Sequence, residues 1–379
     1  MNLNFSDDQI QIRDWARKFS VEKVRPCVSA HQTQKISNEL LKELSTNGFM
    51  ALTVPESLGG LGLDAISFSL VIRELARECA STSITVAVTN MIADVLVREA
   101  TPDQQNQFLK ALIDGRSPTA SFCLTENQSG SDASALQTKA VREGSNYRIN
   151  GEKIYVTNGA FSKFFLVMAK TSDSPRAGDS ISAFLVDRET PGLHIGGEED
   201  KMGLSASSTI RMSFEDVLVP ETQRLQAEGE GFKIAMRALD GGRISVASQA
   251  LGTAEASLEA GIRYAKEREQ FGKPISEFQA IQWKLADAAT QISAAQLLIW
   301  KAADLKSKSK PHSLEAAQAK LFSTEMAAKV CNEMIQVFGG YGYIKEYPVE
   351  RYYRDVRVTA LYEGTSEIQR IVISRALLS

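Results

Sequence analysis

One carboxylate near the C-terminal end of the sequence stands where it could act as a catalytic base. Residues 361–370 read Leu-Tyr-Glu-Gly-Thr-Ser-Glu-Ile-Gln-Arg, which places Glu363 between a tyrosine and a glycine. Gly364 permits close approach of a ligand or an unusual backbone angle, and Ser366 with Gln369 fits the Ser-x-x-Gln capping box that begins a helix. Taken alone, a solvated loop glutamate is the simpler interpretation of this segment.

Few other side chains could carry acid–base or metal chemistry. The three histidines, His31, His194 and His312, are widely separated and lack zinc-type spacing. The four cysteines are far apart and form no Cys-x-x-Cys pair, which suits reduced thiols in a reducing compartment. We therefore expect neither a metal site nor a histidine-based triad, so acid–base chemistry falls to a carboxylate.

Two segments bring possible ligand-binding groups to the ends of predicted strands. Residues 121–132 read Ser-Phe-Cys-Leu-Thr-Glu-Asn-Gln-Ser-Gly-Ser-Asp, a strand followed by a turn dense in hydroxyls and amides. Residues 151–159 deliver the ring of Tyr155 and the hydroxyl of Thr157 just before an Asn-Gly turn. The alternatives are an ordinary polar turn and a hairpin with a core tyrosine.

Two later segments could bind a phosphate or a nucleotide. Residues 268–274 follow a long predicted helix, and Arg268 could pair with a pyrophosphate through its planar guanidinium or simply cap helix carbonyls. Residues 337–342, Val-Phe-Gly-Gly-Tyr-Gly, suit a helix end or close contact with a ligand. Rossmann and P-loop sites are not supported, because neither glycine-rich motif occurs in its required context.

The elements that must position these groups change character twice along the chain. We expect domains at residues 1–116 (helical), 117–222 (β) and 223–379 (helical), an α+β fold with an antiparallel sheet or barrel in the middle. The first helix begins at a Ser6–Gln9 capping box and ends at Pro26. The other expected helices span residues 37–47, 65–80, 82–99, 102–113, 277–306, 314–338 and 366–378. A further long helix is expected to begin near Gly231, with an apolar stripe from Ile244 to Ile262. The expected strands span residues 119–125, 136–142, 147–155, 164–170, 181–186, 193–196 and 209–215.

Composition narrows the class of protein. A chain of 379 residues can bury a large core in two or three domains. The net charge of −3 gives no reason to expect nucleic acid or an anionic membrane as a partner. No signal peptide is visible and no apolar run approaches the length of a membrane span, so we expect a cytoplasmic protein without membrane insertion.

The order and spacing of the motifs are far more specific than any one of them. Residues 122–132, 151–159, 201–220, 268–279, 338–343 and 362–370 together resemble the acyl-CoA dehydrogenase family. The most specific pieces are Lys-Met-Gly-Leu at 201–204 with Phe-Glu-Asp-Val at 214–217, and the segment around Glu363. The resemblance extends over essentially the whole chain.

This resemblance implies a fold, a cofactor and an assembly. The fold would have an N-terminal helical domain, a middle antiparallel β-domain and a C-terminal four-helix bundle. The protein would be a homotetramer, a dimer of dimers, that holds FAD in an extended pose with part of each site completed by a neighbouring subunit. The implied FAD-binding residues are Phe122, Cys123, Leu124, Thr125, Gly130, Ser131, Tyr155, Val156, Thr157, Arg268, Gln279, Gln336, Val337, Phe338, Gly339, Gly340, Thr365, Ser366 and Glu367.

The resemblance also implies a reaction. Glu363 would remove the α-proton of an acyl-CoA thioester while the β-hydride passes to FAD, giving the trans-2-enoyl-CoA, and the electrons would pass to an electron-transferring flavoprotein. The backbone N–H of Glu363 would help to stabilise the thioester oxygen. Some branches of the family carry the base just before the arginine of a long helix, but that position here is Gly242. The implied substrate-binding residues are Ser131, Asp240, Gly241, Gly242, Arg243 and Gly364.

Three departures from the family pattern keep alternatives open. Asn127-Gln128 replaces a usual Pro-Gly, Ser205 a frequent arginine, and Tyr155 a frequent tryptophan. An acyl-CoA oxidase or a catalytically silent acyl-CoA-binding homologue remain alternative functions. The chain length of 379 residues leaves no room for the extra helical region of the larger oxidases, which favours a dehydrogenase. This length and the Gly-Gly-Arg pattern at residues 241–243 together favour short, straight or singly branched acyl groups.

Overall fold

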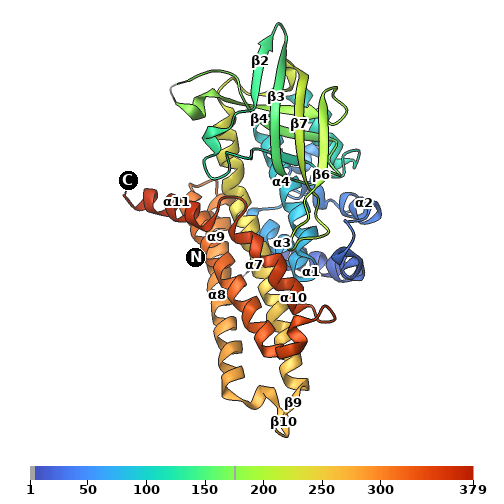
Figure 1. Cartoon of the computed structure of the whole chain (residues 1–379), viewed down its shortest axis with the longest axis vertical. Coiled ribbons are helices and arrows are strands. Elements are labelled where there is room, and N and C mark those ends of the chain that lie inside the picture. The colour runs from blue at the N-terminus through green and yellow to red at the C-terminus, as the bar shows by residue number, and fades with distance from the viewer. Residues whose placement is uncertain (1–4, 175, 379) are drawn as a thin grey trace.

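The computed structural model describes residues 5–174 and 176–378, and these form three parts in chain order (Figure 1). A β-sheet lies at one end of the long axis, and the long C-terminal helices extend from it to the other end. The N-terminal helices lie beside both. The helical, β and helical sequence of elements agrees with the prediction.

The N-terminal part begins as its capping residues predict. Ser6 and Gln9 form both hydrogen bonds of a capping box at the start of α1 (Asp7–Phe19). The α-helix is followed without a break by a π-helical turn (Ser20–Val24) and a 3-10 turn (Arg25–Cys27), so the helical segment ends near the predicted Pro26, although its last residues are not α-helical. The remaining α-helices are α2 (Asn38–Thr46), α3 (Ala65–Glu78), α4 (Ala80–Glu99), α5 (Pro102–Gln104) and α6 (Lys110–Ile113).

Helix α4 is the central apolar element of the molecule. This helix of 20 residues contains an 18-residue stretch with a mean hydropathy of 1.5, which is long and apolar enough to cross a membrane by length and composition alone. The expectation that no apolar run approaches this length is therefore wrong. Because 89% of this apolar stretch is buried inside the protein, we interpret α4 as a core helix packed between the other parts.

The sheet has the strand order β6-β7-β3-β2-β4-β5-β8, with β1 added beside β4. Most pairs are antiparallel as predicted, but β1 and β4 run parallel with Ser121 opposite Phe165, and β2 meets β4 in one parallel pairing. The two-residue strand β8 was not predicted. The strands are β1 (Ser121–Cys123), β2 (Lys139–Glu143), β3 (Asn146–Thr157), β4 (Phe164–Lys170), β5 (Ile181–Asp187), β6 (Leu193–Glu198), β7 (Thr209–Pro220) and β8 (Arg224–Leu225).

The C-terminal part is a helical bundle built around one long helix. Helix α7 (Gly231–Glu267) runs from the sheet to the small β9–β10 hairpin (Glu269–Gln270 and Lys273–Pro274) at the opposite end of the molecule (Figure 1). Small buried side chains along α7, mostly alanine, glycine and serine, let its neighbours pack closely. Those neighbours are α8 (Gln279–Ser307), α9 (Ser313–Phe338) and α10 (Val349–Arg357), and α11 (Ser366–Leu378) crosses the end of α9.

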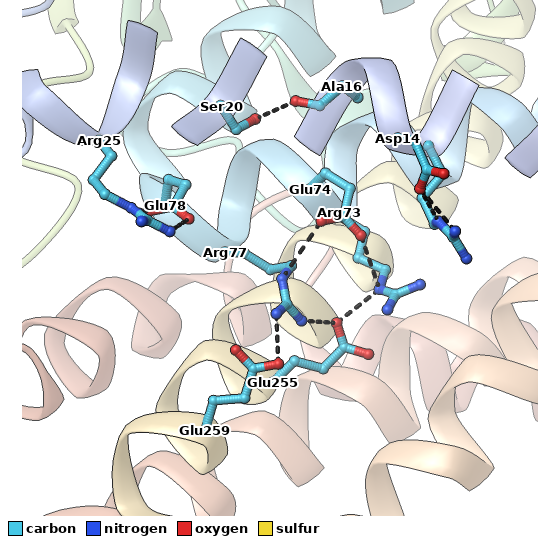
Figure 2. A network of polar contacts seen from close by, with 11 residues as sticks. Asp14, Ala16, Ser20, Arg25, Arg73, Glu74, Arg77, Glu78, Glu255 and Glu259 are labelled. Carbon is cyan, nitrogen blue, oxygen red and sulfur yellow. Dashed lines mark hydrogen bonds and ion pairs between the residues drawn. The ribbon is translucent and has the colours of Figure 1, made fainter. Parts of the chain in front are cut away.

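A buried network of charged side chains fastens the N-terminal helices to this bundle (Figure 2). Arg73 and Arg77 of α3 donate to Glu255 of α7 at 2.7 and 3.0 Å, and Arg77 also donates to Glu259 at 2.5 Å. Glu74 lies fully buried beside the two arginines. The network fixes α3 against α7, and these two helices with α4 form the walls around the candidate site.

Candidate active site

Glu363 lies in a short loop whose backbone is held in an uncommon conformation. We call residues 361–365, between a 3-10 turn and α11, the Glu363 loop. Glu363 has φ of 55° and Gly364 has φ of 86°, so two successive residues are left-handed. A non-glycine residue seldom adopts this conformation, and functional sites are where such strain tends to be kept.

The capping box predicted for α11 is not formed. The hydroxyl of Thr365, not that of Ser366, accepts the Ile368 N–H at 3.3 Å and begins the helix. The Gln369 side chain turns back instead and donates to the carbonyl oxygens of Glu363 and Gly364 at 3.3 and 2.8 Å. Gln369 therefore fixes the Glu363 loop rather than the first turn of the helix.

The Glu363 carboxylate is prepared for proton transfer by its surroundings. Its Oε2 atom is buried and has no hydrogen-bond partner among the described residues. It lies against Gly242 of α7, where an ideal Cβ would stand only 2.5 Å away. Burial raises the pKa of Glu363 to about 7, although the nearby charges of Lys320 and Arg243 act to lower it. A carboxylate with this pKa can accept a proton near neutral pH.

The backbone of the loop offers a hydrogen-bond donor beside this carboxylate. The Glu363 N–H donates to no acceptor within residues 5–174 and 176–378. The Tyr362 hydroxyl, in contrast, donates to the side-chain oxygen of Gln249. The side-chain nitrogen of Gln249 in turn donates to the Ala80 carbonyl at 2.8 Å. The loop is thus anchored on α7 and α4 while one N–H stays available to a ligand.

Two of the predicted substrate-binding residues of α7, Gly242 and Arg243, lie beside Glu363. Arg243 is buried and donates to Asp240, whose other oxygen accepts the Ser313 hydroxyl at 2.5 Å. The Arg243 Nε has no partner among the described residues. Gly241 and Gly242 line a hollow between α3, α4 and α7, whose apolar walls include Phe68, Ala87, Met91 and Ala238. The structure therefore places Gly242 and Arg243 beside Glu363, while Asp240 pairs with Arg243 and Gly241 lines the hollow.

The ends of β1 and β3 form a second cluster, held by a buried ion pair. Lys153 donates to Glu126 at 2.7 Å and to the Leu124 carbonyl at 2.9 Å. Glu126 also accepts the N–H groups of Gln137 and Thr138 at 2.6 and 3.0 Å. Burial opposes its ionisation, but the Lys153 ammonium and these donors hold the pKa of Glu126 below its usual value. The polar turn after β1 is therefore held in one conformation by buried hydrogen bonds and an ion pair.

The altered Asn127-Gln128 segment still closes this turn. The backbone groups of Glu126 and Ser129 exchange two hydrogen bonds across it, at 3.0 and 3.1 Å. Gln128 adds a side-chain hydrogen bond to Glu126 at 2.8 Å. Hydrogen bonds therefore close the turn, although it has neither a proline nor a glycine at positions 127 and 128.

Tyr155 is presented to solvent, so it is not a core tyrosine. It is 60% exposed, has φ of 55° and lies at a bulge in the pairing of β3 with β7. β3 pairs with β2 and β7 and not with β4, so the Asn-Gly that follows it does not close a hairpin. Thr157 is half-buried nearby. Cys123 and Val156 face the core of the sheet and offer only backbone groups to a ligand.

Helix α4 brings the two clusters near one another. Asn158, just after β3, donates to the Thr85 carbonyl at 3.1 Å and to the Thr89 hydroxyl at 3.3 Å. Met91, six residues after Thr85, lies 3.4 Å from the ideal Cβ position of Gly242. Six residues of helix correspond to about 9 Å. The end of β3 and the Glu363 carboxylate therefore lie against neighbouring turns of one helix.

The remaining predicted cofactor residues lie at two other places. Thr365, Ser366 and Glu367 adjoin Glu363. Arg268 follows the far end of α7, about 37 Å along the helix from Arg243 at 1.5 Å per residue. It lies over the Tyr341 ring at 5.4 Å. Gathered around that far end are Gln279, Gln336, Val337, Phe338, Gly339 and Gly340. One chain does not bring these residues to Glu363.

Sequence reasoning missed Lys320 of α9. Its side chain is fully buried, and its ammonium donates to the Gly364 carbonyl at 2.7 Å. Gln249 and Met91 were also not recognised. No group of three or more histidine, cysteine, aspartate or glutamate side chains that could hold a metal ion occurs in the part of the chain that the structure describes.

Comparison with known proteins agrees with this arrangement over the whole chain. The acyl-CoA dehydrogenase N-terminal, middle and C-terminal domain models match residues 6–116, 121–217 and 229–378. A probable acyl-CoA dehydrogenase of Bacillus subtilis (strain 168) is 43% identical over 380 residues, which cover 100% of both chains. The caffeyl-CoA reductase–Etf complex subunit CarC of Acetobacterium woodii is 40% identical over 379 residues, 99% of this chain and 100% of that protein.

A solved structure gives the same result for the fold. The three-dimensional structure of butyryl-CoA dehydrogenase from Megasphaera elsdenii matches with a TM-score of 0.97 at 42% identity, covering 100% of both chains. FAD is the cofactor of this group of proteins. A buried carboxylate of raised pKa, an available N–H and a full-length match in sequence and fold lead to one conclusion: the chain belongs to the acyl-CoA dehydrogenase family of oxidoreductases.

Proposed function

We propose that this protein oxidises a short acyl-CoA thioester to the trans-2-enoyl-CoA, with Glu363 as the base. The α C–H bond breaks and its proton passes to the Glu363 carboxylate. The β-hydrogen leaves with its electron pair as the Cα–Cβ double bond forms, and FAD, when bound, accepts that hydride. The observation that carries the proposal is the buried Oε2 of Glu363, unpaired among the described residues at the edge of the hollow beside Gly242.

The loop itself supplies the second requirement of this reaction. An α-proton beside a thioester is a weak acid, so negative charge that develops on the carbonyl oxygen needs a donor. The Glu363 N–H, which is available to a ligand, supports a role in binding that oxygen. Because the N–H and the carboxylate belong to one residue of fixed backbone conformation, both can act on the same substrate.

The residues near β1 and β3 fit the flavin. Tyr155 exposes an aromatic ring at a bulge, and Thr157 brings a hydroxyl beside it. Gly130 and Ser131 are exposed in the turn after β1, and a Cβ on Gly130 would meet nothing within 4 Å. We propose that these residues, with the backbone of residues 122–125 and 365–367, hold the flavin end of FAD.

A second copy of the chain would complete the cofactor site. Arg268 and the glycines at 339 and 340 are accessible, and a Cβ on either glycine would meet nothing within 4 Å. They lie too far from the Glu363 of their own chain to share one FAD with it, so we propose that they bind the pyrophosphate and adenosine of a neighbouring subunit's FAD. Exposed Phe271 and Trp283 close to this end support such an interface, in a homotetramer.

The relatives support the acyl chain length and the electron acceptor. One of them is a butyryl-CoA dehydrogenase and another is a subunit of an Etf complex. We propose a short acyl-CoA, of about four carbons, as the substrate and an electron-transferring flavoprotein as the acceptor.

Flavin absorbance tests the function directly. The purified protein is mixed anaerobically with a panel of acyl-CoAs from butyryl to palmitoyl, including branched forms, and bleaching of the flavin is followed. Fastest bleaching with a short acyl-CoA, and turnover only when an electron-transferring flavoprotein is added, supports the proposal. Rapid turnover with oxygen alone would identify an acyl-CoA oxidase, and a colourless protein would favour a silent acyl-CoA-binding homologue.

A further inference from the structure

Lys320 occupies a position where a lysine is costly. It lies on the buried face of α9 with no exposed surface. Among the described residues its ammonium makes one hydrogen bond, to the Gly364 carbonyl at 2.7 Å, and it forms no ion pair. Removing an ammonium from water without a carboxylate partner is strongly unfavourable. The packing of α9 alone would be served better by an apolar side chain.

The carbonyl that Lys320 binds is the one that follows the catalytic glutamate. The same Gly364 oxygen accepts the Gln369 side chain at 2.8 Å, so it has one donor from α9 and one from α11. These two donors fix the peptide group between Gly364 and Thr365, and Gln369 also donates to the Glu363 carbonyl at 3.3 Å, so the left-handed turn is held at both of its residues. The Glu363 side chain and N–H are joined to this peptide group through the left-handed backbone of Glu363 and Gly364, so fixing it restrains their direction.

Charge reinforces the geometry. The charged groups that face Glu363 are Lys320 from α9 and Arg243 from α7, while α4 contributes the uncharged Met91. Arg243 is already paired with Asp240. Lys320 faces Glu363 and Arg243; burial lowers its pKa to about 8, while the Glu363 charge acts to raise it. A positive charge near a buried carboxylate favours its ionised form, which is the form a base needs.

We propose that Lys320 is a positioning residue for the base: by binding the Gly364 carbonyl it helps to hold the backbone that carries the Glu363 carboxylate and N–H, and its charge favours the ionised form of Glu363. This rests on the proposed function, in which Glu363 removes the α-proton. Lys320 does not contact the reacting atoms. Gln369 shares the positioning role but not the charge, so the two contributions can be separated.

The test compares pH profiles of anaerobic flavin reduction by butyryl-CoA. In Lys320→Met the acidic limb of the profile moves up by about one pH unit, within the range known for an opposite charge near a carboxylate. The rate therefore falls about tenfold more at pH 6.5 than at pH 9, with KM little changed. In Lys320→Arg, which keeps the charge, the limb returns towards its wild-type position. In Gln369→Leu the rate falls at every pH while the limb stays in place.

Two further variants make the result decisive. Lys329→Met removes an exposed lysine from the same helix and should change neither rate nor limb. Lys320→Gln keeps a hydrogen-bond donor for the Gly364 carbonyl but carries no charge, so the acidic limb of its pH profile must also move up. This variant takes the place of Lys320→Met in the test if Lys320→Met does not hold FAD. An unmoved limb in a charge-removing variant that holds FAD overturns the proposal. If Glu363→Gln kept normal turnover, the proposed function itself would fail, which is a separate outcome.

Discussion

Glu363 and Gly242 are fitted to each other: the Oε2 atom of the glutamate lies 2.5 Å from where a Cβ on residue 242 would be. This contact joins the Glu363 loop to α7 without a hydrogen bond. The atom that a side chain at 242 would displace is the far end of a flexible side chain, so the fold could accommodate an alanine there. The carboxylate, however, would have to move.

Gly242→Ala should therefore impair catalysis more than stability. A displacement of about 1 Å at a reacting group can lower a rate by about a hundredfold, and we expect a loss of that size in the rate of flavin reduction with normal FAD content. The control is the same change in a Glu363→Gln background, where no base remains to be displaced and the further loss should be small. Equal losses in both backgrounds would show that Gly242 acts independently of Glu363.

The pH dependence of the wild-type reaction follows from the raised pKa of Glu363. The base is active when ionised, so the rate of flavin reduction should rise with pH through about 7, the pKa that burial gives this carboxyl. Below the pKa, each pH unit should lower the rate by about tenfold. Anaerobic single-turnover measurements from pH 5.5 to 9 check this, and a rate that is level across the acidic half would exclude Glu363 as the group that titrates.

Lys153 should be essential to the turn after β1. Lys153→Met would leave Glu126 as a buried, unpaired charge, which typically costs about 3–5 kcal/mol. The turn would also lose the donor to the Leu124 carbonyl, so FAD content should fall. Urea unfolding at fixed protein concentration measures the change. Adding Glu126→Gln should restore part of the stability, and no recovery in that double variant would assign the loss to packing.

The network in Figure 2 should contribute more to stability than a surface ion pair does. Arg77→Met removes the arginine that Glu255 and Glu259 share in the interface of α3 with α7. Glu255 keeps Arg73 as a partner and Glu259 is half-exposed, so we expect a loss of about 1.5–3 kcal/mol in the free energy of unfolding. The matched control is Arg116→Met, which breaks an exposed pair with Asp114 and should cost less than about 1 kcal/mol. Similar losses in the two variants would argue against a fastening role for the network.

The sequence predicts elements best where one periodicity is maintained over the whole element. The bounds of β4 and α11 agree with the prediction, and those of α8 and α9 differ by one or two residues. Helix α10 was missed because its sequence, Val-Glu-Arg-Tyr-Tyr-Arg-Asp-Val-Arg, has few apolar residues. The parallel pairing of β1 with β4 could not be predicted, since a strand's own residues do not specify its partner.

The candidate site was predicted in part, for a physical reason. Residue types reveal a base such as Glu363 and glycines beside it, but not which distant side chain supports them. Lys320 could have been noticed, because it interrupts an apolar stripe formed by Ala316, Ala319 and Ala327. Gln369 was misinterpreted because its spacing from Ser366 fits a helix cap, although Thr365 caps the helix.

The most direct test of the account is the rate at which butyryl-CoA bleaches the flavin of Glu363→Gln under anaerobic conditions. The change keeps the size of the side chain and removes its ability to accept the α-proton, so the variant should bind FAD as the wild type does. We predict that flavin reduction slows by at least about a thousandfold, since a positioned base together with its correct geometry contributes that much or more. A rate within tenfold of the wild type would contradict the role of Glu363 as the base.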